Sequence, residues 1–236
     1  MTCERLDKLI SDSGLYSRSE AKALIRAGRV SVNSRTVRTP EQRFDRDAGI
    51  EVDGQKLDCS EYRYFMMDKP AGYVCANEDR KLPTVLQLLP EEFQRLGLFT
   101  VGRLDRDTTG LLLLTNDGDF AHRVISPKSN IEKCYLAKTD GDVTVEDADR
   151  FAEGVELADG TRCLPAKLEP CGPGRCLVRV REGKYHQVKR MLAAVGKPVL
   201  ELRRLSIGGL ELGDDSEPGS LCELHKSDLL AVLTQF

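Results

Sequence analysis

The fold is indicated most strongly by the stretch GRLDRDTTGLLLLTNDG, residues 102–118. A charged turn bounded by glycines runs directly into four leucines, which end at an Asn-Asp-Gly turn. An apolar run closed by turn residues predicts a buried strand. The turn before it would hold the Asp105 carboxylate at the edge of the core, close to the cation Arg103. A fixed aspartate beside a cation suits nucleophilic attack on an electron-poor centre.

The composition is that of an ordinary globular protein. The chain has 236 residues, of which 40% are hydrophobic and 31% charged, which suits a medium-sized domain with one small additional domain. No apolar run is long enough to span a membrane, and the first residues lack a signal-peptide core. We therefore expect a cytoplasmic location and no membrane association. The eight scattered cysteines contain no Cys-x-x-Cys pair, which favours buried thiols over a zinc site or disulfides.

The net charge of −3 conceals two basic segments. Residues 5–40 carry eight basic residues against three acidic ones, and residues 179–204 carry eight against two. The last 26 residues are predominantly acidic. Local basic segments in an acidic protein indicate contact with phosphate groups rather than a polycationic tail. For either segment alone, a solvated helix surface is the simpler interpretation.

The beginning of the chain contains a complete pattern of short helices and strands. Apolar residues at helical spacing come first, and a capping box at residues 17–20 predicts a second helix that ends at Gly28. Valines around Asn33-Ser34 predict a small hairpin. We therefore predict a small α/β domain at residues 1–58, followed by a linker at residues 59–63.

This pattern resembles the S4 domain, a small RNA-binding domain shared by a ribosomal protein and several RNA-modifying enzymes. The matching segments are RLDKL at 5–9, Ser17-Arg18, Ala21, Leu24-Ile25, Gly28 and V-x-V-N at 30–33. Ser34 stands where that family usually has glycine, which slightly alters the turn. Several basic residues fall about one helical turn apart, so they can face one phosphate backbone. The RNA-binding residues expected here are Arg5, Lys8, Arg18, Lys22, Arg26 and Arg29.

From residue 64 onwards, short strands and helices follow without regular βαβ alternation. Strands are expected at residues 65–67, on both sides of the turn at 70–72, at 99–101, at 134–137, around the turn at 159–160 and at 177–181. Helices are expected at residues 83–89, 91–96, 117–124 and 144–151. We therefore predict an α+β domain over residues 64–236 with a mixed, largely antiparallel sheet.

Three further segments belong with the Asp105 turn. Lys69-Pro70-x-Gly72 predicts a rigid loop that carries a cation. Tyr135 lies in an expected strand, where it can stack on a base, although a core tyrosine is the simpler interpretation of a lone example. The third is GKYHQVKRML at residues 183–192. As a helix, it would bury Tyr185, Val188, Met191 and Leu192 and place His186, Lys189 and Arg190 on a shared face.

Together these four segments resemble the pseudouridine synthases of the ribosomal small-subunit type, over nearly the whole chain. The combination of GRLD, T-x-GLL and G-x-YHQVKRM is highly specific. The segments at 64–66, 72–75, 126–127, 132–136 and 207–209 resemble the small-subunit branch. Asp68 stands where the family more often has asparagine, and we expect little effect on the chemistry. The resemblance implies the pseudouridine synthase fold for the large domain.

The resemblance also implies the reaction, which is an isomerisation without cofactor or metal. A uridine in RNA is detached at its glycosidic bond, the uracil is rotated, and it is rejoined through a ring carbon. Asp105 corresponds to the essential aspartate, which acts on the anomeric carbon or through a sugar or base intermediate. The other implied roles are Lys189 as the basic partner of the aspartate, Arg103 as the residue that helps displace the base, Tyr135 stacking on the flipped uracil, and Lys69 and Arg190 touching the RNA backbone.

His186 and Asp107 are alternative candidates for proton transfer. Imidazole is poised near neutral pH, but no Ser or Cys nucleophile motif accompanies His186, and the family needs none. Asp107 could form an acid–base dyad with Asp105. The sequence favours instead a turn carboxylate that hydrogen-bonds the backbone near Thr108 and Thr109.

The prediction is therefore a pseudouridine synthase that acts on one uridine of 16S, small-subunit, ribosomal RNA. We expect a monomer, because no coiled-coil pattern is present, and an assembly intermediate as the substrate. Three alternatives stay open at this point. They are a sister enzyme for large-subunit ribosomal RNA, a base-releasing glycosylase that uses the same aspartate, and a non-catalytic RNA chaperone.

Overall fold

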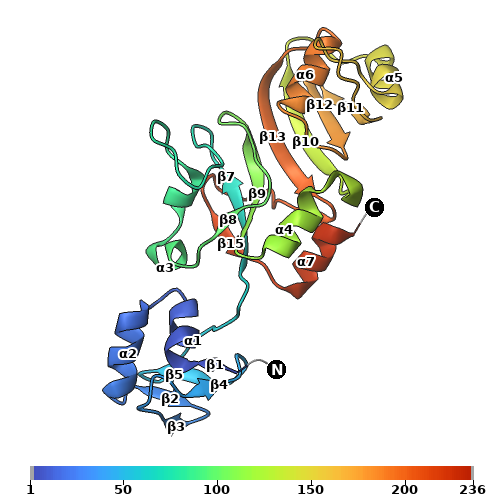
Figure 1. Cartoon of the computed structure of the whole chain (residues 1–236). Coiled ribbons are helices and arrows are strands. Elements are labelled where there is room, and N and C mark those ends of the chain that lie inside the picture. Colours follow the sequence, from blue (N-terminus) through green and yellow to red (C-terminus); the bar gives the residue numbers. More distant parts are fainter. Residues whose placement is uncertain (1–2, 235–236) are drawn as a thin grey trace. The chain divides into compact units, whose positions relative to one another are not determined.

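The computed structural model describes residues 3–234 and divides into two compact units (Figure 1). The first unit comprises the chain up to Arg63 together with Leu89–Leu98. The second comprises Tyr64–Leu88 and the chain from Phe99 onwards. The segment Leu89–Leu98 thus packs with the N-terminal unit, although it lies within the range 64–236 expected for the large domain.

The first unit combines short helices with two antiparallel sheets. β1 pairs with β4, and the remaining strands form a sheet in the order β3-β2-β5-β6. Leucine and isoleucine side chains of α1 and α2 share one core with the valines of β2. The elements are β1 (Glu4–Arg5), α1 (Leu6–Asp12), α2 (Arg18–Arg26), β2 (Val30–Val32), β3 (Arg35–Thr36), β4 (Arg43–Phe44), β5 (Ile50–Val52), β6 (Gln55–Lys56) and α3 (Glu91–Gln94).

Local sequence signals account for the ends of these elements. The Ser17 side chain accepts a hydrogen bond from the Glu20 amide, and the Glu20 carboxylate accepts one from the Ser17 amide. The predicted capping box is therefore confirmed. Asn33 and Ser34 adopt φ values of 49° and 64° between β2 and β3. Two successive left-handed residues are what a two-residue hairpin turn requires, so the predicted hairpin is also confirmed.

The second unit is built on one nine-stranded sheet. Its main order is β11-β12-β10-β13-β9-β7-β15, and only the β13–β9 pair is parallel. The predicted mixed, largely antiparallel sheet is therefore confirmed. The strands are β7 (Tyr64–Lys69), β8 (Phe99–Thr100), β9 (Thr109–Thr115), β10 (Lys133–Thr139), β11 (Lys167–Gly172), β12 (Arg175–Val180), β13 (Val199–Ile207), β14 (Leu210–Glu211) and β15 (Leu221–Glu223).

Helices cover the sheet in two groups, each with its own core. α4 and α7 lie together although they are far apart in the sequence (Figure 1), and they enclose leucines of β9. α5 and α6 pack on β10, β12 and β13. The helices are α4 (Gly118–Ile125), α5 (Val145–Glu153), α6 (Gln187–Ala194) and α7 (Lys226–Leu233), with short 3₁₀ turns η1 (Val85–Leu88) and η2 (Pro127–Ser129).

The four leucines that suggested a buried strand form the centre of β9. Leu111–Leu114 are at most 1% exposed, as predicted. Just before them, Gly110 has φ 99°, and a Cβ there would lie 2.2 Å from the carbonyl oxygen of Arg204. Only glycine fits this approach, where β9 and β13 run parallel. The Asp105 turn is thereby held next to β13.

Two of the expected strand regions are shorter in the structure. The strand expected after Gly72 is reduced to a single bridge between Val74 and Thr84. The strands expected around residues 159–160 are likewise reduced to the bridge between Glu156 and Arg162. Their apolar residues, such as Val155 and Leu157, are buried all the same, but an apolar pattern alone does not form a ladder without a partner strand along its length. Within residues 3–234, no helix is long and apolar enough to cross a membrane.

Candidate active site

The turn that carries Asp105 is braced by Lys69. The Lys69 side chain is buried, and burial lowers the pKa of its ammonium group. That group donates hydrogen bonds to three backbone carbonyls, those of Pro70 (3.0 Å), Arg106 (3.3 Å) and Thr108 (2.9 Å). A lysine has three donors, so all of them are used by backbone carbonyls, two of which belong to the turn. The expectation that Lys69 touches RNA is therefore wrong.

The Asp105 carboxylate is contacted at both oxygens. Lys189 Nζ lies 3.2 Å from Oδ2, and His186 Nε2 lies 3.3 Å from Oδ1. Lys189 belongs to α6, and His186 is the residue just before it. The N-terminal end of α6 therefore contacts both oxygens of the carboxylate. The Asp105 side chain is still 26% exposed, so it is held in place without being sealed off.

Asp107 shares the same cation. Its Oδ1 accepts a hydrogen bond from Lys189 Nζ at 2.6 Å, which lowers the pKa of Asp107. Burial disfavours the charged form of Lys189, but its hydrogen bonds to Asp107 and Asp105 outweigh this effect and raise its pKa. The side chain of Asp107 thus pairs with Lys189, and its backbone hydrogen bond is to its own amide.

Helix α6 begins later than its sequence pattern predicts. His186 adopts the left-handed conformation, with φ 48°, at the N-cap. The preceding Tyr185 lies outside the helix and is 73% exposed, so the prediction that it is buried is wrong. Gln187 holds this segment, because its side chain donates to Glu182 (2.8 Å) and accepts from the Lys184 amide (2.9 Å).

The polar residues predicted to share a helix face separate in the structure. His186 and Lys189 meet at Asp105, whereas Arg190 Nη2 lies 2.5 Å from Asp159 Oδ2. Arg190 therefore stands apart from the Asp105 cluster. The remaining apolar residues of the helix are buried as predicted: Val188, Met191 and Leu192.

A cavity of about 80 Å³ lies beside Asp105. Arg103 and Tyr135 line it together with Asp105, so three of the four predicted catalytic residues meet there. The fourth, Lys189, contacts Asp105 directly. The Arg103 guanidinium forms no hydrogen bond or ion pair with any residue between 3 and 234. Complete ligand pockets usually exceed about 300 Å³, so this cavity is too small for a whole nucleotide.

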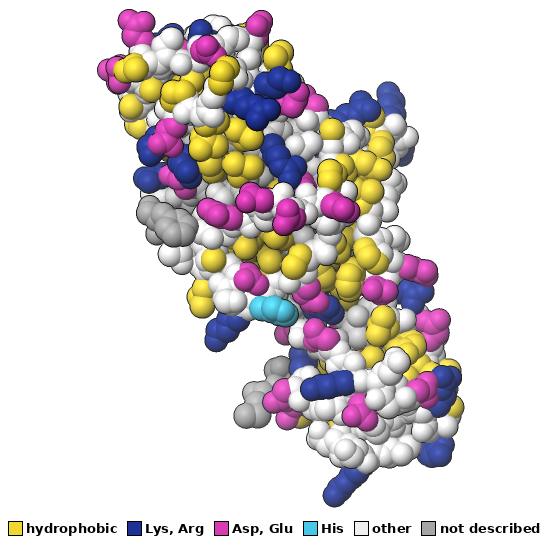
Figure 2. Space-filling model, turned by 180° about the vertical axis from the view of Figure 1, so that it is seen from behind, with side chains coloured by type: hydrophobic (Ala, Val, Ile, Leu, Met, Phe, Trp, Pro, Cys, Tyr) yellow, Lys and Arg dark blue, Asp and Glu magenta, His cyan; other side chains and the backbone are white. Residues whose placement is uncertain are grey.

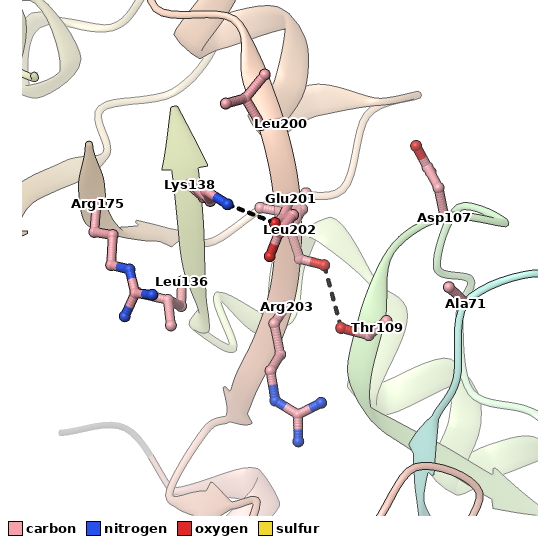
Figure 3. A pocket seen from close by; sticks show the side chains of 10 residues that line it. All are labelled: Ala71, Asp107, Thr109, Leu136, Lys138, Arg175, Leu200, Glu201, Leu202 and Arg203. Atoms are coloured by element: carbon pink, nitrogen blue, oxygen red, sulfur yellow. Dashed lines mark hydrogen bonds and ion pairs between the residues drawn. The ribbon is translucent and has the colours of Figure 1, made fainter. Parts of the chain in front are cut away.

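A larger cavity of about 310 Å³ adjoins the first. Figure 3 shows it between β13 and the turns that carry Ala71 and Asp107. Leu202 lines both cavities. An ion pair of 2.8 Å between Lys138 and Glu201 forms part of the wall. Asp105 and Tyr135 do not line this space, so the chemistry belongs to the smaller cavity and the larger one offers room beside it.

Two family models match the sequence. The S4 domain matches residues 4–50, and the RNA pseudouridylate synthase family matches residues 63–194. The second match covers more than half of the chain and includes every residue of the Asp105 cluster. The chain belongs to the RNA pseudouridylate synthase family.

Individual relatives of this synthase are similar over nearly its whole length. The ribosomal small subunit pseudouridine synthase A of Escherichia coli is 42% identical over 233 residues, which cover 97% of this chain and 100% of that protein. An uncharacterized RNA pseudouridine synthase of Bacillus subtilis is 40% identical over 95% of this chain and 96% of that protein. A crystal structure of a pseudouridylate synthase, 37% identical, covers 97% of this chain and 99% of its own, with a TM-score of 0.69.

In the S4 domain of this synthase, three predicted RNA-binding cations surround Asp7. Its Oδ2 lies 2.9 Å from Arg5 Nη2, 3.6 Å from Arg18 Nε and 3.8 Å from Lys22 Nζ. Burial favours the neutral form of Asp7, but the Arg5 hydrogen bond and the charges of Arg18 and Lys22 outweigh it and lower its pKa. Sequence reasoning missed this role, for which the RLDK motif was the available signal. Asp7 thus gathers three cations on one surface.

The other three predicted RNA-binding residues are arranged differently. Lys8 pairs with Glu4 at 2.9 Å. Arg29 lies beyond the end of α2 and pairs with Asp53, so it does not continue the helical row as expected. The Arg26 guanidinium has no partner among residues 3–234. On the face shown in Figure 2, Lys and Arg side chains likewise alternate with Asp and Glu.

The sequence did not predict that His186 contacts Asp105 or that Asp107 pairs with Lys189. The signal for His186 was its spacing of three residues from Lys189, which brings side chains together near a helix. The signal for Asp107 was its alternation with Asp105. Neither pattern specifies the partner, because the contacts join segments that are distant in the sequence.

Proposed function

We propose that this protein isomerises one uridine of small-subunit ribosomal RNA to pseudouridine. The observation that carries the proposal is the Asp105 carboxylate, held by Lys189 and His186 beside a cavity lined by Tyr135. The substrate is supported by the relatives named ribosomal small subunit pseudouridine synthase A, which are 40% to 42% identical over 97% of the chain.

In this reaction Asp105 is the nucleophile. Its carboxylate attacks the anomeric carbon while the bond from that carbon to the uracil nitrogen breaks, and the freed uracil rotates. A ring carbon of the uracil then bonds to the anomeric carbon and displaces the Asp105 carboxylate. That ring carbon loses its proton, and the nitrogen that left the sugar gains one. Lys189 and His186 fix the orientation of the carboxylate before attack, and a fixed approach geometry lowers the entropic part of the barrier. Lys189 also places a preorganised positive charge beside the reacting atoms, where negative charge develops on the departing uracil.

Tyr135 and Arg103 contribute to extruding and binding the target base. An enzyme that modifies a base inside an RNA structure must first extrude it. Tyr135 lines the smaller cavity, where its ring can stack on the uracil. Arg103, whose guanidinium has no partner within residues 3–234, is available to occupy the position that the base leaves. The Lys69 loop contributes by fixing the turn rather than by binding RNA.

The N-terminal region docks the RNA. We propose an RNA-binding domain at residues 1–58, a linker at 59–63 and a catalytic domain at 64–236. The cations gathered by Asp7, together with Arg26, would contact phosphates, and Arg190 would contact the substrate backbone once it exchanges its partner Asp159. Because each neutralised phosphate releases counterions, affinity for RNA should fall steeply as salt concentration rises.

We further propose that the enzyme acts as a monomer in the cytoplasm on an assembly intermediate of the small subunit. Light scattering at micromolar concentration tests the monomer. Comparison of naked ribosomal RNA with partly assembled particles tests the substrate state. Faster modification of the particles would support an assembly intermediate.

The function is tested by mapping pseudouridine at each position of both ribosomal RNAs from cells with and without this protein. We expect one small-subunit site to be lost on deletion and restored by the wild-type gene. An unchanged small-subunit map would defeat the proposal, and a lost large-subunit site would reassign the substrate. Release of free uracil by the purified enzyme would identify a glycosylase, because an isomerase returns the base to the chain.

A further inference from the structure

We propose that Tyr185 is a stacking platform for a nucleobase that flanks the target uridine in the RNA. This inference rests on the proposed function and adds a contact that the reaction itself does not require. Tyr185 is the most exposed aromatic residue near Asp105, with 73% of its surface accessible. An exposed aromatic ring offers a face on which a nucleobase can stack.

The Tyr185 ring is already held in a defined plane. It stacks on the imidazole of His186, with ring centroids 3.8 Å apart and an interplanar angle of 19°. Because His186 covers one face and most of the residue is exposed, the opposite face of Tyr185 is accessible. A second planar ring can therefore stack there without rearrangement, and such preorganisation lowers the entropic cost of binding.

The backbone that carries the pair is fixed as well. His186 has φ 48° at the start of α6. On one side, Gln187 is bonded to Glu182 and to the Lys184 amide. On the other side, the Arg190 guanidinium donates to the Tyr185 carbonyl oxygen at 3.3 Å. These bonds hold Tyr185 in place outside the helix.

The position of the pair specifies the ligand. His186 Nε2 lies 3.3 Å from Asp105 Oδ1, so only the imidazole separates the Tyr185 ring from the nucleophile. A base seated on Tyr185 would therefore belong to a nucleotide next to the one that reacts. Extruding a base removes the stacking partner of its neighbours, and Tyr185 would replace that partner. Stacking on an aromatic side chain accepts any base.

The test compares Tyr185→Ala and Tyr185→Phe in the full-length enzyme on a small-subunit ribosomal RNA transcript. Base–aromatic stacking corresponds to about a 5- to 100-fold change in affinity. We expect Tyr185→Ala to raise KM and Kd by that factor with kcat at saturating RNA within about twofold of the wild type. Tyr185→Phe should behave as the wild type. Tyr62→Ala, which removes another exposed tyrosine, is the matched control.

A second set of RNA substrates identifies which neighbouring base stacks on Tyr185. Short transcripts with an abasic nucleotide on either side of the mapped uridine should weaken binding to the wild type at one of the two positions. The same abasic nucleotide should cause no additional loss with Tyr185→Ala, because the two changes remove one interaction. The proposed stacking on Tyr185 would be contradicted if Tyr185→Ala left KM unchanged or lowered only kcat. It would also be contradicted if the losses from Tyr185→Ala and from the abasic nucleotide were additive. Absence of pseudouridine with the wild-type enzyme would instead overturn the proposed function.

Discussion

Lys189 Nζ lies 3.2 Å from Asp105 Oδ2. We predict that Lys189→Met lowers kcat by about 10²- to 10³-fold, since it removes a preorganised charge beside the nucleophile. KM should change less than about threefold, because the lysine contacts the carboxylate rather than the RNA. Lys189→Arg, which keeps the positive charge, should recover part of the rate. Single-turnover rates and RNA titrations measure both quantities.

Lys197→Met is a suitable control for the loss of a lysine from the same unit. It should leave kcat within about twofold of the wild type, because Lys197 does not contact the Asp105 cluster. Full activity of Lys189→Met would show that Asp105 needs no cationic partner.

His186 is predicted to position Asp105 through its contact with the other carboxylate oxygen. Because misplacing a reacting group by about 1 Å can cost about 10²-fold in rate, His186→Ala should lower kcat roughly tenfold or more. His186→Asn should recover part of this loss, because asparagine tolerates the left-handed backbone and retains a donor. Thermal unfolding should be similar for both variants. Equal, wild-type rates in both would contradict a positioning role.

Local features of the fold followed from local sequence. The capping box at Ser17 and Glu20, the hairpin at Asn33-Ser34 and the buried strand at Leu111–Leu114 each depend on neighbouring residues alone. The strand expected after Gly72 did not form, because a strand also needs a partner along its whole length.

The site was predictable in its members but not in all of its contacts. Arg103, Asp105 and Tyr135 line one cavity as the motifs suggested. Lys69 was misinterpreted because a cation in a turn gives no sign of whether it is buried. Tyr185 was misinterpreted because the helical period continues through it, whereas the left-handed residue that follows ends the helix. Such effects depend on backbone geometry that residue spacing does not encode.

Asp68 forms a buried ion pair that ties β7 to β13. Its carboxylate oxygens lie 3.0 Å and 2.6 Å from the Arg203 guanidinium. Removing one partner of a buried pair costs about 3–5 kcal/mol, and Arg203 is 31% exposed. We therefore expect Asp68→Ala to lower the free energy of unfolding by about 2–3 kcal/mol and Asp68→Asn by less.

Urea denaturation measures this difference, with the exposed Asp119→Asn as the control. The chemistry should be preserved, so kcat of folded Asp68→Asn should stay within about threefold of the wild type. A loss of activity without a loss of stability would mean that Asp68 serves the reaction rather than the fold.

Lys133 should make stability depend on pH above neutrality. Burial and the nearby charge of Arg204 lower its pKa to about 8, whereas an unfolded lysine titrates near about 10.4. Between these values the unfolded chain binds more protons, so this group adds stability as pH rises. Relative to Lys133→Met, the wild type should gain on the order of 1–2 kcal/mol from pH 8 to 10.5, after allowance for partial exposure.

Chemical denaturation of both proteins at several pH values measures this gain. The comparison with Lys133→Met cancels the titration of the other groups. A difference that stays constant across the range would show that Lys133 does not titrate in the folded protein near pH 8.

Asp105 is the nucleophile of the proposed reaction. The most direct measurement is a single-turnover assay of wild type and Asp105→Asn on small-subunit ribosomal RNA, with pseudouridine mapped by position. We predict one modified uridine with the wild type and a rate at least about 10³-fold lower with Asp105→Asn, while RNA affinity and thermal stability stay close to the wild type. Pseudouridine formed by Asp105→Asn at the wild-type rate and position would contradict the account.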